Sequence, residues 1–130
     1  MKLLIKNGTI SGSSENTFAD VLIHDGLIAR TEPGISEDGA DRVIDAGGMY
    51  ILPGGVDPHV HMHLPAAAGF SSDDFYTGSR AALYGGTTTI IDFVTPSRGE
   101  SLIKALEKRK LEAENSLADY AFHVSPVEWR

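Results

Sequence analysis

Three histidines stand at alternate positions in one short stretch, "DPHVHMH". They are His59, His61 and His63. Residues two apart point to the same side of a β-strand, so an extended backbone would bring their imidazoles to one face. Neutral imidazole is a good ligand for zinc and similar divalent metals. The spacing therefore predicts a metal site built on His59 and His61. The alternative is a polar strand face that is merely rich in histidine.

The composition limits what else could take part in such a site. The chain has no cysteine, so a metal would be held by His, Asp, Glu or a modified side chain. A formal net charge of −7 argues against a protein that tracks nucleic-acid phosphates. A lysine and an Asn7-Gly8 turn interrupt the first apolar run, which is too short for a signal peptide or a membrane span. We expect a cytoplasmic protein that binds neither nucleic acid nor a membrane.

Residues 1–53 read as short strands joined by turns. The stretch "KLLIKNGTIS" is aliphatic, and Asn7-Gly8 within it signals a turn or bulge. The stretch "ADVLIHDGLIARTE" predicts a hairpin, because Asp25-Gly26 suits a type I′ turn with positive φ at both central positions. Two further extended pieces flank Gly47-Gly48. We expect a small antiparallel β unit.

Residues 54–130 change character and alternate strands with helices. Ser71 or Ser72 can cap the first helix, and Ser97 with Glu100 has the spacing of a capping box for the second. The expected order is a strand "VDPHVHMH", a helix in 71–86, a strand "TTTIIDFV", a helix in 97–116 and a strand "DYAFHVSP". This β-α-β-α-β order favours a parallel sheet in an α/β fold.

The second helix should pack through an apolar face made of Leu102, Ile103, Leu106 and Ala113. Its charged run "EKRKLE", residues 107–112, reads as a solvated face rather than a nucleic-acid patch.

Four other polar residues are candidates for the site or for the fold. Asp92 and His123 each have two interpretations, whereas Asp57 and His24 have one each. Asp92 lies near the end of its strand and either orients a metal-binding histidine or caps the following turn. His123 either points towards the metals or is a hydrogen-bonded core histidine. Asp57 is expected to be structural, and His24, beside the Asp25-Gly26 turn, to lie on the surface.

Two longer stretches carry a resemblance, "LPGGVDPHVHMHLP" and "DDFYTGSRAALYGGTTTIIDFVTP". They resemble the amidohydrolase superfamily and, within it, the dihydropyrimidinase and hydantoinase branch. The resemblance implies a (β/α)8 TIM barrel beside a β-sandwich built from both chain termini. Residues 1–53 would be a sandwich segment, and 54–130 the first three strands and two helices of the barrel. It also implies that His59 and His61 bind the more buried of two zinc ions.

The same resemblance implies machinery that is missing from these 130 residues. In the family, a carboxylated lysine, two more histidines and an aspartate that serves as general base come from later strands. A complete barrel takes about 250 residues. We therefore expect an N-terminal segment that contains no catalytic residue and is inactive alone. Its open sheet edges should be covered by the remainder of the barrel or by a homo-oligomer.

His63 departs from the family pattern. Dihydroorotases typically have an arginine there, and related hydantoinases an Asp, Asn or Gln. His63 either lines the substrate pocket or is simply exposed at the strand end.

The function that these features predict is zinc-dependent hydrolysis of a cyclic amide, a dihydropyrimidine or a hydantoin. One alternative is a non-catalytic scaffold like the collapsin response mediator proteins. Another is a hydrolase like allantoinase or dihydroorotase. Retention of both His59 and His61 favours an enzyme.

Overall fold

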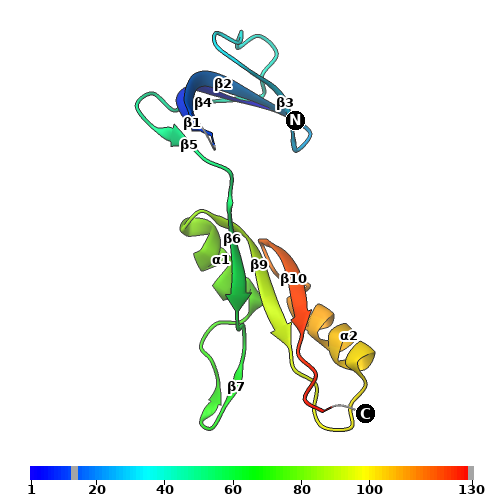
Figure 1. Cartoon of the computed structure of the whole chain (residues 1–130). Helices are drawn as coiled ribbons and strands as arrows, with labels where there is room; N and C mark the ends of the chain where they lie inside the picture. Colours follow the sequence, from blue (N-terminus) through cyan, green and yellow to red (C-terminus); the bar gives the residue numbers. More distant parts are fainter. Residues whose placement is uncertain (13–14, 129–130) are drawn as a thin grey trace. The chain divides into compact units, whose positions relative to one another are not determined.

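Strand β1 forms the centre of a five-stranded sheet in the N-terminal part of the chain (Figure 1). The computed structural model describes residues 1–12 and 15–128, and it divides into two compact units, Met1–Pro53 and Gly54–Arg130. The strands of the first unit are β1 (Lys2–Ser11), β2 (Asn16–His24), β3 (Leu27–Glu32), β4 (Arg42–Asp45) and β5 (Tyr50–Ile51).

The predicted hairpin is confirmed, since β2 and β3 pair antiparallel around Asp25 and Gly26, whose φ angles are 50° and 82°. The predicted bulge at Asn7-Gly8 is also confirmed. Pairing of β1 with β2 shifts register between Ile5 and Gly8, and Asn7 has a φ of 60°. A bulge of this kind leaves an amide without a ladder partner.

The expectation of a wholly antiparallel unit is wrong, because the sheet is mixed. β4 and β5 both pair with β1 in parallel, one after the other along its length. The physical reason is the connection before β4. The loop 33–41, with positive φ at Gly34 and Gly39, carries the chain back to the starting end of β1, so β4 runs in the same direction as β1.

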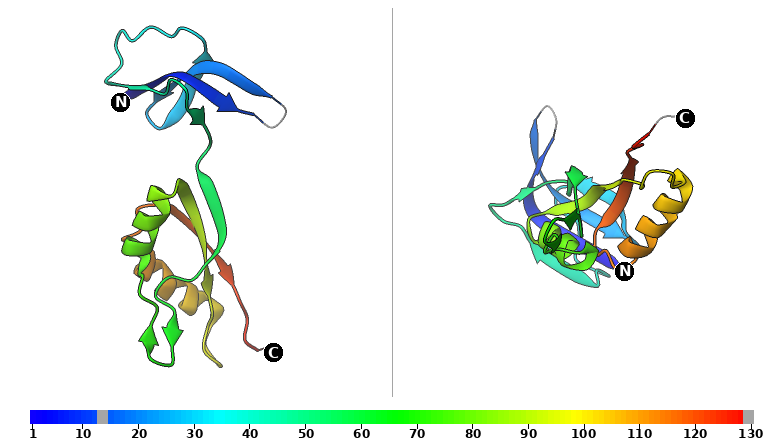
Figure 2. Two further views of the ribbon diagram at one scale, coloured as in Figure 1. Left: turned by 90° about the vertical axis from the view of Figure 1, so that its left-hand side faces the viewer. Right: turned by 90° about the horizontal axis from the view of Figure 1, so that it is seen from below.

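The second unit is an α/β layer with a three-stranded parallel sheet in the order β10-β9-β6 (Figure 1). Helices α1 and α2 pack on one face of this sheet and touch each other (Figure 2). Its elements are β6 (Gly55–Val60), β7 (Pro65–Ala66), β8 (Gly69–Phe70), α1 (Phe75–Tyr84), β9 (Thr87–Val94), α2 (Leu102–Ala113) and β10 (Asp119–Val124). The predicted β-α-β-α-β order is confirmed.

The core of this unit forms where β9 faces the helices. Met62, Phe75, Ile90 and Ala113 are buried together there. In β9, Ile90, Asp92 and Val94 are buried and alternate with half-buried neighbours. This period of two means that Phe93 points away from the helices. The described part of the chain holds no helix with the length and apolar character that a bilayer crossing requires.

Three details around the first strand differ from the expectation. β6 ends at Val60, so His61 lies just outside it and His63 lies in a turn with a φ of 47°. A short hairpin, β7-β8, which the sequence analysis missed, follows directly. Neither serine caps α1: the Ser71 hydroxyl accepts from the Leu64 N–H at 2.8 Å.

The cap of α1 is Asp74. Its carboxylate accepts from the Thr77 N–H at 2.8 Å, and the Thr77 hydroxyl accepts from the Asp74 N–H at 3.1 Å. The Thr77 N–H bond holds the pKa of the Asp74 carboxyl below its usual value.

The predicted packing face of α2 is confirmed at Ala113 and at the half-buried Leu106, and it is wrong at Leu102 and Ile103. Leu102 and Ile103 are 44% and 67% exposed, whereas Ala105 and Ala113 are buried. Ser97 and Glu100 do bond to each other, but in a turn that precedes the helix, which begins at Leu102. The buried face follows the spacing i, i+4, i+8, and its middle position is Arg109, a member of the run predicted to be solvated.

Candidate metal centre

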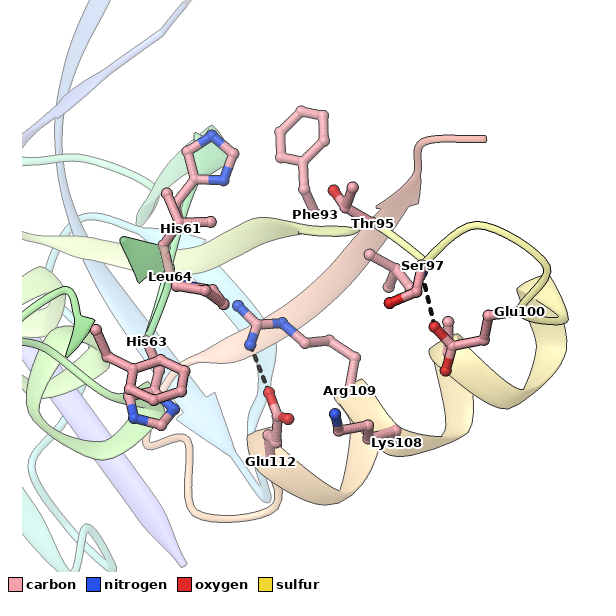
Figure 3. Close-up of a pocket in the computed structure, with 14 residues that line it drawn as sticks. His61, His63, Leu64, Phe93, Thr95, Ser97, Glu100, Lys108, Arg109 and Glu112 are labelled. Carbon is pink, nitrogen blue, oxygen red and sulfur yellow. Dashed lines mark hydrogen bonds and ion pairs between the residues drawn. The ribbon is translucent and has the colours of Figure 1, made fainter. Parts of the chain in front are cut away.

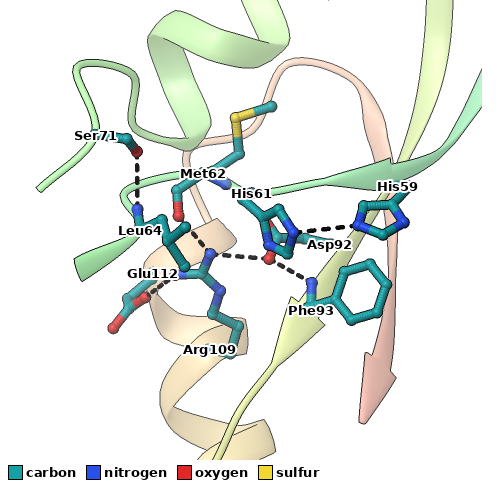
Figure 4. Close-up of polar contacts among 9 residues, drawn as sticks. All are labelled: His59, His61, Met62, Leu64, Ser71, Asp92, Phe93, Arg109 and Glu112. Atoms are coloured by element: carbon teal, nitrogen blue, oxygen red, sulfur yellow. Dashed lines mark hydrogen bonds and ion pairs between the residues drawn. The ribbon is translucent and has the colours of Figure 1, made fainter. Parts of the chain in front are cut away.

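The rings of His59 and His61 meet at the end of β6 (Figure 4). Their Nε2 atoms are 3.2 Å apart, and the ring planes stand at 80° with centroids 5.1 Å apart. Two nitrogens bound to one tetrahedral zinc at about 2.0–2.1 Å lie about 3.3 Å apart. The observed separation therefore suits two ligands of a single ion. The two atoms compared are the ones that would bind the ion, because each ring presents its Nε2 to the other.

Phe93 forms an apolar floor under the histidines. Its ring centroid lies 4.5 Å from that of His59 and 5.1 Å from that of His61. The ring is half-buried and extends from the sheet face opposite the helices. Contacts on one side of each imidazole restrict the rotamers that each ring can adopt, so Phe93 helps to keep the two Nε2 atoms together.

His123 reaches the same floor from β10. Its ring centroid lies 4.9 Å from that of Phe93, and its Nε2 lies 3.2 Å from the Pro58 carbonyl oxygen. The side chain is hydrogen-bonded, as one interpretation predicted, but it is exposed and not part of the core. In this contact the Nε2 donates to a carbonyl, which leaves it unavailable as a ligand.

His63 does not share a face with the other two histidines, contrary to the expectation that all three could. The turn at Met62-His63 rotates it away, and its ring stacks on Phe70 of β8 with centroids 4.1 Å apart. It lines a pocket of about 320 Å³ together with His61, Phe93, Lys108 and Arg109 (Figure 3).

Asp92 does not bond an imidazole directly, and it does not cap the turn after β9. It is fully buried, and its Oδ2 accepts from the Met62 N–H at 2.8 Å. Its Oδ1 accepts from Arg109 Nη2 at 2.9 Å. The carboxylate thus holds the backbone directly after His61 (Figure 4).

Arg109 is the site residue that sequence reasoning missed. Its side chain is 12% exposed, and its guanidinium bonds Asp92, Glu112 and the Met62 carbonyl. The guanidinium carbon lies 4.7 Å from the centroid of the Phe75 ring. A sequence signal for its burial was available. Arg109 lies four residues from both Ala105 and Ala113, and such small residues let that face of a helix approach a sheet closely.

The remaining predicted residues have structural contacts. The Asp57 carboxylate accepts from the His59 N–H at 3.1 Å, so it shapes the backbone of β6 as expected. The His24 side chain is 51% exposed and lies beside Asp25. Within residues 1–12 and 15–128, no group of three or more His, Asp or Glu side chains is placed to hold a metal ion. The candidate centre is the pair His59 and His61.

Residues 50–125 match the amidohydrolase family, and this match spans more than half of the chain. The chain belongs to the amidohydrolase family. The match includes β6, β9 and β10, and with them every residue of the candidate centre.

Relatives of this amidohydrolase chain include a D-hydantoinase from Geobacillus stearothermophilus, 47% identical over 95% of the chain. A dihydropyrimidinase from Rattus norvegicus is 41% identical over 98% of it. A crystal structure of D-hydantoinase matches with a TM-score of 0.91 and 46% identity over 95% of the chain. The mixed α/β fold is therefore that of the corresponding part of hydantoinase structures.

The amidohydrolase chain covers only part of each of these proteins. It spans 26% of the Geobacillus enzyme, 26% of the rat enzyme and 27% of the crystallised D-hydantoinase.

Proposed function

We propose that this chain supplies the first metal-binding strand of a zinc-dependent enzyme that hydrolyses cyclic amides. His59 and His61 are the proposed ligands. The observation that carries the proposal is the 3.2 Å separation of their Nε2 atoms, which suits one ion. The names of the relatives, D-hydantoinase and dihydropyrimidinase, supply the substrate class, a hydantoin or a dihydropyrimidine ring.

The proposed setting of the site is a (β/α)8 TIM barrel of which the second unit forms the start. Three parallel strands in chain order, with both helices on one face, are the arrangement that such a barrel repeats. The first unit would be a β-sandwich segment. The outer strands β6 and β10 would then pair with further strands, from the remainder of a barrel or from a second copy of the chain.

The chain's own residues have three tasks in this proposal. His59 and His61 present two ring nitrogens, and Phe93 covers one side of both rings. The backbone after His61 is fixed by the Asp92 carboxylate. When bound, zinc would polarise the ring carbonyl and activate water. The general base is not assigned to any residue of this chain.

Metal binding by the purified chain tests the ligand assignment. We expect calorimetric titration with zinc to show weak binding, because two histidines fill only half of a tetrahedral site. His59→Ala and His61→Ala should each abolish it. His24→Ala, a change at an exposed histidine in the first unit, is the matched control. Tight binding that survives His61→Ala would contradict the assignment.

A chimera separates an enzyme segment from a non-catalytic relative. This chain would replace the matching segment of the Geobacillus stearothermophilus D-hydantoinase, with hydantoin hydrolysis as the readout. We expect the chimera to turn over and His61→Ala within it to lose more than about 100-fold in rate. The 130-residue chain alone should hydrolyse neither hydantoin nor dihydrouracil. A folded, metal-loaded chimera without activity would favour the scaffold alternative.

A further inference from the structure

We propose that Asp92 and Arg109 act together as a buried clamp that positions His61 for metal binding; the inference rests on the proposed function of the histidine pair. Asp92 comes from β9 and Arg109 from α2. Neither touches an imidazole. Both hold the peptide groups of Met62, the residue that follows His61 (Figure 4).

The clamp holds both polar groups of one residue. The Asp92 Oδ2 accepts the Met62 N–H at 2.8 Å, and the Arg109 Nη2 donates to the Met62 carbonyl. The same Nη2 donates to the Asp92 Oδ1 at 2.9 Å, which closes the arrangement. A charge-assisted bond on each side fixes the plane of the backbone more tightly than neutral bonds would.

The backbone at this point needs such support because the strand has ended. β6 stops at Val60, and its pairing with β9 shifts register between Asp57 and Val60. His63 then adopts a φ of 47°, which is uncommon for a residue with a side chain. The alternation that would place His59 and His61 on one face is therefore not maintained by the sheet ladder alone.

Because Asp92 and Arg109 are buried, they can fix the position of the Met62 backbone. Asp92 is fully buried, and the Arg109 side chain is 12% exposed and packs over Phe75. Both side chains are enclosed between the sheet and α2, so their charges have little water to bond instead. Removing Arg109 would leave the Asp92 carboxylate buried without a cation, and removing Asp92 would leave the guanidinium only the partly exposed Glu112 as a counter-charge. The end of β6 is thus coupled to a helix that is distant in sequence.

Arg109→Gln and Asp92→Asn in the full 130-residue chain test the clamp. We expect each to weaken zinc binding by about tenfold, the lower end of what outer partners of metal ligands contribute. The imidazole resonances of His61 in the metal-free chain should shift as well. Lys110→Met removes the neighbouring cation, which pairs with the exposed Glu107, and should change neither readout. Far-UV circular dichroism monitors the fold.

Zinc affinity within twofold of the wild type in both folded variants would overturn the clamp. If the single variants unfold, the double variant Asp92→Asn/Arg109→Gln leaves no buried unpaired charge, since Glu112 is exposed, and it is read in the same way. Hydrogen exchange of the unmodified chain is an independent test. The Met62 amide should exchange as slowly as that of Ile90 in β9, and exchange at the rate of an open loop would also overturn the proposal.

The two proposals fail in distinguishable ways. Zinc binding that is indifferent to His61→Ala would remove the ligand assignment. The exchange of the Met62 amide and the resonances of His61 are measured without metal, so they report on the clamp even then.

Discussion

Each of the two units buries one aspartate, and the two carboxylates hold different kinds of partner. Asp20 in the first unit is 3% exposed and accepts two backbone amides, from Asn7 at 2.8 Å and Ile35 at 2.9 Å. Asp92 in the second unit is fully buried, and it accepts the Met62 amide and binds the Arg109 cation. The first joins a bulge to a loop, whereas the second joins a sheet, a helix and the histidine motif.

The difference separates an architectural carboxylate from one that supports a site. Asp20 supplies the acceptor that the bulge at Asn7 lacks, and its contacts are with the backbone. Asp92 forms a salt bridge with Arg109, and Arg109 also donates to the Met62 carbonyl beside His61. Burial alone does not distinguish the two residues. Their partners do, because the Asp92–Arg109 ion pair connects β9 and α2 to the backbone beside His61, the proposed metal ligand.

The largest effect is expected from Asp92→Ala, which removes the buried counter-charge of the Arg109 guanidinium, leaves it only the partly exposed Glu112, and deprives the Met62 amide of its acceptor. We expect the second unit to lose about 3–5 kcal/mol of stability. Hydrogen exchange at the Ile90 amide measures this, with the Leu4 amide of β1 as the internal control for the first unit. A loss of stability below about 1 kcal/mol would show that Asp92 contributes no more to its unit than an ordinary side chain.

Asp20→Ala should have a somewhat smaller effect, confined to the first unit. It leaves the Asn7 and Ile35 amides without acceptors, and each orphaned amide costs about 1–3 kcal/mol. The Ile35 amide is buried but the Asn7 amide only partly so, and the Asn7 amide should cost the lower figure; we expect a total of about 2–4 kcal/mol at the Leu4 amide. Zinc binding should stay at the wild-type level. An Asp20 variant that weakened zinc binding as much as Asp92→Asn would erase the distinction between the two carboxylates.

Two glycines, one in each unit, allow a comparison of packing, and their substitution should have an intermediate effect on stability. A methyl group at Gly8 would lie 2.3 Å from the Ile51 Cδ1 and 3.3 Å from the Ala46 Cβ, while one at Gly78 would lie 2.3 Å from the Met62 Sδ. Overpacking costs about 1–3 kcal/mol. Gly8→Ala should fall at the upper end, because isoleucine is stiff, and Gly78→Ala at the lower end, because a thioether adapts. Urea unfolding of both variants checks the order, and the reverse order would contradict it.

The smallest effect is expected from the cap of α1. The pKa of Asp74 is lowered by its bond from the Thr77 N–H, so the cap stabilises the folded state above the unfolded value of 3.8. This contribution disappears as pH falls through the lower folded pKa. Asp74→Ala should reduce the thermal midpoint by a few degrees at neutral pH, about the effect of one cap. The difference from the wild type should shrink below about pH 3.8.

Asp74→Asn is the control for that prediction. It keeps a side-chain acceptor at every pH, so it should retain most of the stability and show no loss in acid. An Ala variant whose deficit persists unchanged at low pH would show that the carboxylate charge is not what stabilises α1.

Local signals predicted most of the elements because the relevant interactions are close in sequence. Asp25-Gly26 produced its hairpin, since both residues take positive φ. The apolar run of β9 was predicted with the bounds that it has, Thr87–Val94. The pairing of the His59 and His61 nitrogens followed from alternation, even though His61 lies one residue past the strand. That these two residues bind a metal stays a prediction.

The misses have a different cause, which is that contacts and chain paths outside the local motif decide them. Ser71 does not cap α1, because the helix begins at Phe75 and Asp74 occupies the capping position; the Ser71 hydroxyl accepts from the Leu64 N–H instead. His63 left the common face because the backbone turns after the Asp92 carboxylate takes the Met62 amide. The parallel pairing of β4 with β1 depends on the path of the loop 33–41 rather than on any local motif.

The sequence by itself determined both helices, most of the strands and the spacing of the two histidines, since propensity and period are properties of neighbouring residues. Only the tertiary structure decided that Arg109 is inside and Leu102 and Ile103 are outside. A charged residue in a helix reads as solvated unless a buried carboxylate faces it, and that carboxylate belongs to another strand. The support of His61 therefore became visible only when β9 and α2 were brought together.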